Sequence, residues 1–393
     1  MTALETGGPQ ATLDAVRDLV PALRANGKAT EAQRSVLREN IDLLDAAGVF
    51  RMTVPHRFGG LDFPLADQYR ILAEVARGCS ATGWAAQIWS AASWVPTLFP
   101  EQAQEEIFAR GSVRVSAGLT PTGTLTPAEG GYTLNGSWKW ISGCAAADWF
   151  NLSAVPEGTD GPPIPMGAMV PASQVTIVDD WDTTSAAGTG SATVVATNVF
   201  VPAHRTMRLP DLLGTGSPDR SNTGATGRNY PMVPYFMVIG AAVYLGMAQG
   251  AYELFLDRLP GRGITYTSWT DQSQSPLTHI QVATAADKIA AARALTESWI
   301  PVLQDLADAG EQPTLAQRAT LRGQIGFCVQ LLREAVEILH SASGASVIHR
   351  DAPFQRFFHD LTGLSLHALF LPTANLELQG RVAVGLDPDS AFL

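Results

Sequence analysis

Apolar side chains recur three and four residues apart over roughly the first hundred residues, and this spacing predicts a layer of amphipathic helices. Thr30 and Gln33 have the spacing of a capping box, which predicts the start of the second helix, and Gly48 marks its end. The apolar positions of the predicted helices are, in order, Leu13, Val16, Val20 and Leu23; Leu37, Ile41 and Leu44; and Leu65, Tyr69, Leu72 and Val75.

From about Ser112 the apolar pattern changes from helical spacing to alternation, and Gly, Pro, Thr and Val become frequent, which predicts β structure. The strongest local signal is the segment Tyr132–Trp140, where Asn135 and Gly136 lie between alternating runs and predict a tight hairpin turn. Further strands are expected near residues 166–170, 175–178 and 192–201.

Residues 210–232 are rich in Gly, Ser, Asn, Pro and Thr, which predicts a long loop between domains. Beyond this loop the helical spacing returns, and a second capping box at Thr314 and Gln317 introduces one of the helices. Four long helices in a row are typical of a bundle. They are expected near residues 238–259, 282–306, 314–339 and 353–371.

The order of these elements predicts an α+β multidomain protein. We expect an all-α N-terminal domain at 1–111, a central β-barrel or β-sandwich domain at 112–209, an inter-domain loop at 210–232 and a C-terminal four-helix bundle at 233–393.

Composition adds limits on partners and location. The chain has 393 residues, 46% of them apolar, which is enough for a large core. A formal charge of -11 without clustered Lys or Arg disfavours a nucleic-acid partner. We expect no membrane span, because no run approaches ~20 apolar residues, and no signal peptide at Met1–Gln10, which together predict a cytoplasmic protein. A charged fraction of only 16% favours a large subunit interface.

Several common chemistries lack their motifs. Cys79, Cys144 and Cys328 are far apart and show no metal-ligand spacing, so we expect three buried thiols and no metal. The chain has no GxSxG, GxxxxGK[ST], HExxH or GxGxxG motif in a suitable context. A serine hydrolase, a P-loop enzyme, a zinc protease and a Rossmann dehydrogenase are therefore disfavoured.

One pair of residues points to a ligand. Trp140 and Ser142 are two residues apart at the end of a predicted strand, so in regular alternation both side chains project from the same face. An indole and a hydroxyl would then contact the same ligand.

At these residues the chain resembles the acyl-CoA dehydrogenase superfamily, in which a Trp and a hydroxyl residue on a β-domain strand lie against a flavin ring, the hydroxyl near N5. The resemblance spans nearly the whole chain and implies flavin contacts at Trp140, Ser142, Leu119, Thr120 and Gly188. The segments that carry it are Val54-Pro55, Gly59-Gly60, Leu119-Thr120-Pro121, Trp140-Ile141-Ser142-Gly143, Gly188-Thr189-Gly190-Ser191 and Val199-Phe200-Val201-Pro202.

The C-terminal part resembles one branch of that superfamily. Dehydrogenases of this fold use a Glu as base, whereas the matching position here is Ala368, beside His367. The pattern is similar to two-component (group D) flavin-dependent hydroxylases of phenols and polycyclic aromatics, which carry a His at this place. Gly344 and Ala345 resemble their loop close to the flavin of a neighbouring subunit. Arg262 and Gln281 fall where relatives contact flavin across a subunit interface.

The resemblance implies the oxygenase component of a two-component monooxygenase. It would hydroxylate an aromatic or polycyclic substrate, phenolic or polyketide-like, through a flavin C4a-hydroperoxide formed from O2 and reduced flavin (FMNH2 or FADH2). A separate NAD(P)H-flavin reductase would supply the flavin, and the enzyme would be a homotetramer. Ser142 would hold the N5 proton, and His367 would move a proton because imidazole titrates near neutrality.

Other interpretations stay open. Trp84, Trp89 and Trp94 could line an aromatic substrate pocket or pack in the core. The function could be that of an acyl-CoA dehydrogenase with tightly bound FAD, of an N-oxygenase acting on an amino sugar, or of a non-catalytic interaction protein. Thr362, Leu369 and Phe370 depart from the hydroxylase pattern, so the substrate stays open. The Glu residues available as a dehydrogenase base are Glu253, Glu334, Glu337 and Glu377.

Overall fold

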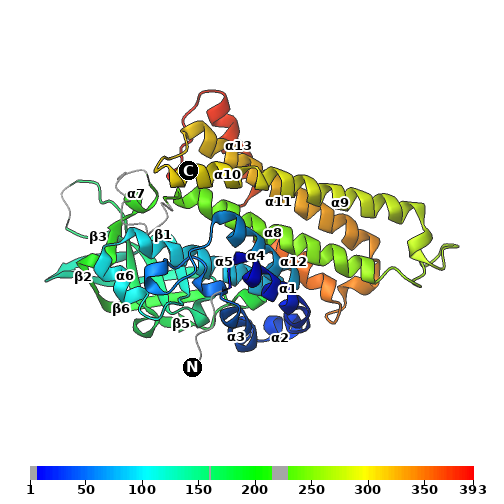
Figure 1. Ribbon diagram of the computed structural model, residues 1–393, viewed down its shortest axis with the longest axis horizontal. Coiled ribbons are helices and arrows are strands. Elements are labelled where there is room, and N and C mark those ends of the chain that lie inside the picture. The colour runs from blue at the N-terminus through cyan, green and yellow to red at the C-terminus, as the bar shows by residue number, and fades with distance from the viewer. Residues whose placement is uncertain (1–6, 159–160, 215–228) are drawn as a thin grey trace.

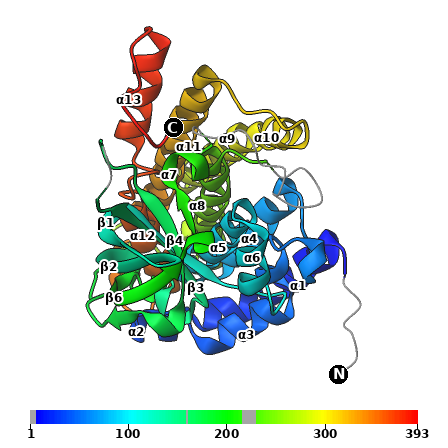
Figure 2. The same ribbon diagram turned by 90° about the vertical axis from the view of Figure 1, so that its left-hand side faces the viewer.

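The computed structural model describes residues 7–158, 161–214 and 229–393. The sheet lies at one end of an elongated molecule, and the long helices α9 and α11 extend away from it (Figure 1). The N-terminal helices pack beside the sheet and along α8 (Figure 2). The predicted domain boundaries at residues 111, 209 and 232 stay a prediction. Residues 215–228 of the predicted inter-domain loop lie outside the described residues.

The N-terminal layer is helical, as its spacing predicts. The four apolar positions of the first predicted helix are all buried on one face of α1. The layer consists of α1 (Pro9–Ala25), α2 (Gly27–Ala32), α3 (Arg38–Ala46), α4 (Leu65–Gly78), α5 (Ser80–Trp94) and α6 (Glu101–Ile107).

The capping box expected at Thr30 and Gln33 is wrong. Thr30 lies inside the short helix α2, and α3 begins only at Arg38. Thr30 packs instead against Gly188, where a Cβ atom would lie 2.7 Å from the Thr30 Cγ2. Tertiary contact with the sheet region therefore decides the conformation of this segment.

The central region forms one seven-stranded sheet of order β5-β6-β2-β1-β3-β4-β7, in which β1 and β3 are parallel. Its inner face carries a separate apolar cluster that includes Trp138 and Ile141. The strands are β1 (Val115–Ala128), β2 (Gly131–Ile141), β3 (Trp149–Pro156), β4 (Met166–Pro171), β5 (Thr176–Val178), β6 (Ala192–Pro202) and β7 (Thr206–Arg208).

The tight turn between β1 and β2 is at Glu129 and Gly130, so the prediction of a hairpin turn at Asn135-Gly136 is wrong. Gly130 has a φ of +77°, in the left-handed region that glycine adopts without steric cost. Asn135 and Gly136 lie inside β2, where the pairing with β6 shifts register. Long-range pairing on both sides of β2 therefore outweighs the local turn propensity.

The bundle contains more breaks than its apolar stripes predict. The capping box at Thr314 and Gln317 is confirmed, because each residue's side chain bonds the other's backbone N–H. The stripe from 282 to 306 is divided at Ser298, since Pro301 cannot donate the backbone bond that would continue the helix. The helices are α7 (Leu209–Leu212), α8 (Met232–Asp257), α9 (Pro276–Glu297), α10 (Trp299–Asp308), α11 (Leu315–Ala342), α12 (Pro353–Leu364) and α13 (Pro372–Ala383).

Helix α8 is the most apolar element. Its length and composition would suffice for a membrane span, contrary to the expectation that no segment would qualify, yet 89% of its most apolar window is buried inside the protein. Its neighbours α4, α5, α11 and α12 all pack against it. We conclude that α8 is the core helix between the N-terminal layer and the bundle.

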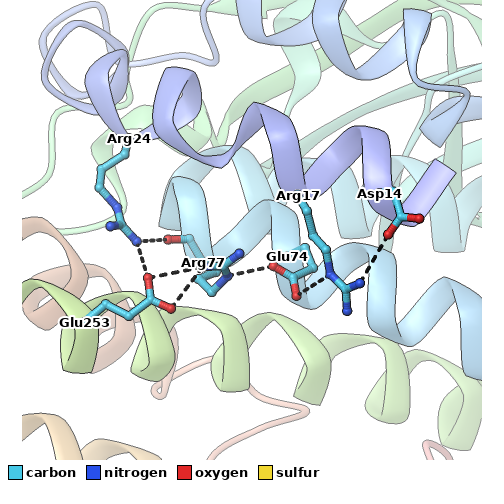
Figure 3. Close-up of polar contacts among 6 residues, drawn as sticks. All are labelled: Asp14, Arg17, Arg24, Glu74, Arg77 and Glu253. Carbon is cyan, nitrogen blue, oxygen red and sulfur yellow. Dashed lines mark hydrogen bonds and ion pairs between the residues drawn. The ribbon is translucent and has the colours of Figure 1, made fainter. Parts of the chain in front are cut away.

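A row of ion pairs ties α1 and α4 to α8 (Figure 3). Glu253 of α8 binds Arg24 of α1 at 2.8 Å and Arg77 of α4 at 2.9 Å. Glu74 extends the row, since it pairs with both Arg77 and Arg17 of α1. These contacts fix α8 against α1 and α4 of the N-terminal layer.

Candidate active site

Three residues from three regions of the chain meet at the indole of Trp84. The Trp84 Nε1–H donates a hydrogen bond to the Ser142 Oγ, 3.0 Å away. The imidazole of His367 meets the same indole edge-on, with ring centroids 5.5 Å apart. Trp84 lies in α5, Ser142 directly follows β2, and His367 lies between α12 and α13. The structure thus brings Ser142 and His367 together across one buried tryptophan.

Ser142 also belongs to a chain of hydroxyl groups. Its Oγ lies 2.8 Å from the Ser191 Oγ, which lies 2.7 Å from the Thr189 Oγ1. Thr189 donates in turn to the carbonyl oxygen of Ala186 at 2.7 Å. Ser191 and Thr189 are buried, whereas Ser142 is only half-buried. Ser142 is therefore the end of the chain that a ligand can reach.

Asp360 of α12 holds the far end of this chain. Its Oδ1 accepts the backbone N–H of Ala186 at 2.6 Å, and its other oxygen accepts the hydroxyl of Ser80. Ala186 has a φ of +54°, a conformation that a non-glycine residue adopts only when contacts enforce it. Burial raises the pKa of Asp360 to about 6, against the hydrogen bonds from Ser80 and Ala186, which lower it.

His367 lies in the turn after α12, which ends at Leu364, and not inside a helix reaching 371 as predicted. The backbone N–H of Leu369 donates to the His367 Nδ1 at 3.3 Å, so the neutral ring carries its proton on Nε2. Desolvation by the surrounding protein lowers the pKa of His367 to about 4, although the residue itself is exposed at the surface. The expectation that this imidazole titrates near neutrality is therefore wrong: the surrounding protein keeps it neutral.

Aromatic side chains close the site on the side of α8. Tyr244 and Phe370 both pack against Trp84, with ring centroids at 5.8 and 6.0 Å. The Tyr244 hydroxyl donates to the carbonyl of Leu364 at 2.6 Å and so fixes the end of α12. Gly240 leaves the space that the Phe370 ring fills. These contacts hold His367 against Trp84.

Trp140 is strained and exposed. Its φ is +63°, in a register shift between Trp138 and Ile141 that breaks the regular alternation of β2. The inward positions are therefore Trp138 and Ile141, three apart, and the argument that alternation places Trp140 and Ser142 on one face fails. Its indole is 76% exposed, which is unusual for so large a side chain.

The other predicted flavin contacts of the β domain lie nearby in the fold. Leu119 and Thr120 belong to a bulge of β1, since residues 119–122 lie between the paired positions Gly118 and Gly123. Gly188 precedes Thr189 in the turn η6 (Ala187–Thr189), packed against α2 and α5. A side chain at Gly188 would displace the turn that carries the hydroxyl chain.

A second cluster forms at the far end of the bundle. The Arg262 guanidinium donates to the carbonyl of Ser343 and to the Ser346 Oγ, and Arg258 bonds the same Oγ at 2.9 Å. Gly344 and Ala345 lie between these two acceptors, and both are exposed. Gln281 is half-buried in α9 and does not join this cluster through any described hydrogen bond. The loops that carry Arg262 and Gly344 lie away from the sheet (Figure 1).

The three tryptophans of α5 divide into two roles. Trp84 contacts Ser142 and His367, whereas Trp89 donates to the carbonyl of Gly143 at 3.1 Å and Trp94 packs on Tyr235 with centroids 5.1 Å apart. All three are at most 3% exposed. Trp84 is thus the tryptophan of α5 that meets both Ser142 and His367.

The comparisons with known proteins identify the family. Residues 9–112 match the acyl-CoA dehydrogenase N-terminal domain, and residues 238–372 match the acyl-CoA dehydrogenase C-terminal domain. The chain is 30% identical, over 100% of both lengths, to the flavin-dependent monooxygenase oxygenase subunit HsaA of Mycobacterium tuberculosis. The chain belongs to the flavin-dependent monooxygenases of the acyl-CoA dehydrogenase superfamily. The predicted fold and enzyme class are thereby confirmed.

Two further relatives resemble this monooxygenase over nearly all of its length. The oxygenase component of the FADH(2)-dependent resorcinol hydroxylase of Rhizobium sp. is 30% identical, covering 96% of this chain and 95% of its own. The structure of XiaF from Streptomyces sp. in complex with FADH2 and glycerol superposes with a TM-score of 0.91 at 25% identity, over 98% of both chains.

The Glu residues considered as a dehydrogenase base are engaged elsewhere in this monooxygenase. Glu253 binds Arg24 and Arg77, and Glu334 binds Lys288 at 2.6 Å. Glu337 and Glu377 bond Ser341 and Arg381 on their own helices. No contact of these carboxylates with Ser142 or His367 occurs among the described residues. The position beside His367 is Ala368, which has no acid or base.

Three residues of the site are not singled out by the sequence patterns. Ser191 and Thr189 stand in the sequence only as part of the family motif Gly188–Ser191, and no pattern points to Asp360. One signal was available: Thr189 and Ser191 are two apart beside glycines, as hydroxyls of one turn and strand would be. The three cysteines are free and buried as predicted. Among the described residues no group of His, Cys, Asp and Glu side chains is arranged to hold a metal ion.

Proposed function

We propose that this monooxygenase is the oxygenase component of a two-component system, which hydroxylates an aromatic, phenolic or polycyclic substrate with O2 and reduced flavin. The observation that carries the proposal is the junction of Ser142 and His367 at Trp84. It supports a site where a hydroxyl and a neutral imidazole act on the same bound molecules.

The residues present fit a flavin. Ser142 Oγ accepts from Trp84 and keeps a further lone pair for a ligand N–H. Trp140 is held exposed in a strained conformation, which supports a role in stacking on a flat ring. Leu119 and Thr120 lie in the β1 bulge, outside its regular pairing with β3. Together with Gly188 they would hold the isoalloxazine. When bound, reduced flavin supplies the electrons that activate O2.

His367 would bind the substrate oxygen. Because Nδ1 accepts from Leu369 and the ring is neutral, Nε2–H is the group that His367 presents. A neutral donor stabilises negative charge that develops on a phenolic oxygen without first taking up a proton. Phe370 and Trp84 pack against the imidazole and keep it in this orientation. The sequence predicts an aromatic pocket of Trp84, Trp89 and Trp94. Of these three, Trp84 is the one whose contacts support a role in binding the substrate.

The relatives support the substrate class. The relatives include the oxygenase components of resorcinol hydroxylase and of p-hydroxyphenylacetate 3-hydroxylase, and both named substrates are phenols. We therefore place a small phenolic or polycyclic compound first among substrates. HsaA is an oxygenase subunit, and such a subunit works with a second component. This supports a separate NAD(P)H-flavin reductase that delivers FMNH2 or FADH2. A cytoplasmic location remains part of this proposal.

A homotetramer would complete the flavin site. Arg262 bonds Ser343 between the loops that follow α8 and α11, and these loops lie at the end of the bundle away from the sheet, which supports a contribution of Arg262, Gly344 and Ala345 to a neighbouring subunit's flavin. Gln281 on α9 would contact that flavin from the same face. Large apolar side chains on these segments are exposed, which supports an interface there. They are Tyr266, Trp269, Leu277, Ile280 and Ile348.

The test is a coupled assay. The purified chain, a flavin reductase, NADH, FMN or FAD and a panel of phenols are incubated under 18O2, and products are analysed by mass spectrometry. We expect one 18O atom in a hydroxylated product, and loss of that product in Ser142→Ala and His367→Asn. Glu334→Gln, far from the site, is the matched control. Reduction of flavin by an acyl-CoA without O2 would instead support a dehydrogenase.

A further inference from the structure

The hydroxyl chain behind Ser142 has a fixed direction. The Ala186 carbonyl can only accept, so Thr189 must donate its one proton there. Thr189 Oγ1 can then only accept from Ser191, which lies 2.7 Å away. Ser191 has thereby used its proton, so in the 2.8 Å contact with Ser142 the donor must be Ser142. Each proton in the chain is assigned by the acceptor at its end.

This direction decides what Ser142 offers to a ligand. Its single proton points to Ser191, and one of its two lone pairs accepts the Trp84 Nε1–H. What remains is a lone pair. Ser142 is half-buried, and both of its partners are fixed, since Trp84 and Ser191 are at most 4% exposed. The hydroxyl can therefore accept a hydrogen bond from a ligand but cannot donate one.

We propose that Ser191 and Thr189 are positioning residues that make Ser142 an obligate acceptor and so make the site selective for reduced over oxidised flavin. N5 of reduced flavin carries a hydrogen and donates, whereas N5 of oxidised flavin has a lone pair and accepts. A fixed acceptor matches the first form and opposes the second. The inference rests on the proposed function, because it assumes that Ser142 faces N5.

The Ala186 carbonyl, at the end of the hydroxyl chain, is held in place by contacts on both sides of its residue. Ala186 O, the final acceptor, is held by the Asp360 bond to the Ala186 N–H and by the Trp181 Nε1–H at 3.2 Å. Asp360 also bonds Ser80, one helical turn before Trp84 in α5. The contacts therefore close a ring that joins α5, Ser142 directly after β2, Ser191 directly before β6, η6 and α12. A closed ring resists rotation of any one hydroxyl in it.

Two substitutions should have different effects on Ser142. In Thr189→Val, Ser191 loses its acceptor and turns its proton to Ser142, so Ser142 is left with a free proton to donate to a ligand. In Ser191→Ala, the Ser142 proton loses its acceptor and is free to rotate toward a bound ligand, because the Trp84 Nε1–H can only donate. Thr189→Ser keeps the hydroxyl and should behave as the unmodified protein. Ser153→Ala is the matched control, since Ser153 is a buried serine of β3 whose hydroxyl has no hydrogen-bond partner among the described residues.

The experiment measures dissociation constants of oxidised and reduced FMN and FAD under anaerobic conditions, without substrate or turnover. We expect the unmodified chain, Thr189→Ser and Ser153→Ala to bind reduced flavin more tightly. Thr189→Val should change the ratio of the two constants by about tenfold toward oxidised flavin, equivalent to about 1.4 kcal/mol. Ser191→Ala should change it in the same direction by a smaller factor.

The outcomes separate the two claims. If both variants lose affinity for the two flavin forms in parallel, with the ratio unchanged, the hydroxyls are merely structural and the inference is wrong. The same holds if the ratio changes in Ser142→Ala but in neither variant. If the unmodified chain binds no flavin in either form, the proposed function itself fails.

Discussion

The imidazole of His367 rests edge-on against the indole of Trp84, with the ring planes at 65°. The Nε1–H of the same indole donates a hydrogen bond to Ser142. A single buried tryptophan thus sets the positions of the two residues that sequence and family point to. Trp84 is 1% exposed and packs on Tyr244 as well, so it has little freedom to move.

Replacing Trp84 by Phe should weaken the binding of reduced flavin about fivefold. Phe keeps an aromatic ring against His367 but removes the N–H that orients Ser142, and one such hydrogen bond contributes about 1 kcal/mol. Trp299→Phe is the matched control, because Trp299 also loses an indole bond, to Gln324 at 2.6 Å, but in α10 and far from the site. Anaerobic fluorescence titration measures both. Equal affinities for the two variants would contradict the role of Trp84.

His367→Asn should lower the hydroxylation rate by about a hundredfold, the usual effect of removing one donor to a developing charge. Because the pKa of His367 is lowered to about 4, the imidazole is neutral at every pH from about 6 to 8, and the factor should be the same throughout. The rate is measured for both proteins across that range. A factor that grows as the pH falls toward 6 would show that the imidazolium form is active.

The lowered pKa of His367 also affects stability. The unfolded chain takes up the proton near the ordinary value of 6.5, whereas the folded protein resists it down to about 4. The contribution to stability is therefore present above pH ~6.5 and is lost as the pH falls toward 4. In His367→Asn, the free energy of unfolding should therefore depend less on pH between about 6.5 and 4, as measured by urea unfolding.

Asp360→Asn should remove a pH dependence of opposite sign. Burial raises the pKa of Asp360 from 3.8 to about 6, so the folded protein binds this proton more tightly than the unfolded chain. The contribution is fully present below about pH 4 and is lost as pH rises through about 6, by at most about 3 kcal/mol. Urea unfolding at several pH values should show that the free energy of unfolding of the variant, relative to that of the unmodified protein, rises from pH ~4 to ~7. Parallel curves would contradict the assignment.

Glu253→Gln should leave hydroxylation unchanged and cost about 1 kcal/mol or less of stability. Glu253 is 36% exposed and its pairs with Arg24 and Arg77 are partly screened by solvent, so each contributes little. The loss should shrink further at high salt. Thermal unfolding and the coupled assay measure the two effects. A large loss of activity with normal stability would revive Glu253 as a catalytic base.

The features that the sequence predicts are those set by local spacing. The α1 stripe and the Thr314 capping box depend on residues a few positions apart, and both are confirmed. The family motif at Ser142 likewise predicts a hydroxyl, which the structure places at Trp84, the residue that His367 also contacts. These inferences need no knowledge of what packs against the segment.

The features that it does not predict depend on neighbours far along the chain. Pairing of β2 with β6 extends the strand through Asn135-Gly136 in place of a turn. A register shift at the end of the same strand turns Trp140 out of the alternation. Desolvation by the surrounding protein lowers the pKa of His367, and the direction of the Ser142 hydroxyl depends on Ala186, held by Asp360. None of these partners is near in sequence.

The most direct test of the account is a crystal structure of the anaerobic complex with reduced FMN or FAD. We expect the isoalloxazine ring to lie between Ser142 and His367, with N5 within hydrogen-bond distance of the Ser142 Oγ. A ring bound elsewhere, or one from which both Ser142 and His367 are turned away in every subunit, would contradict the account.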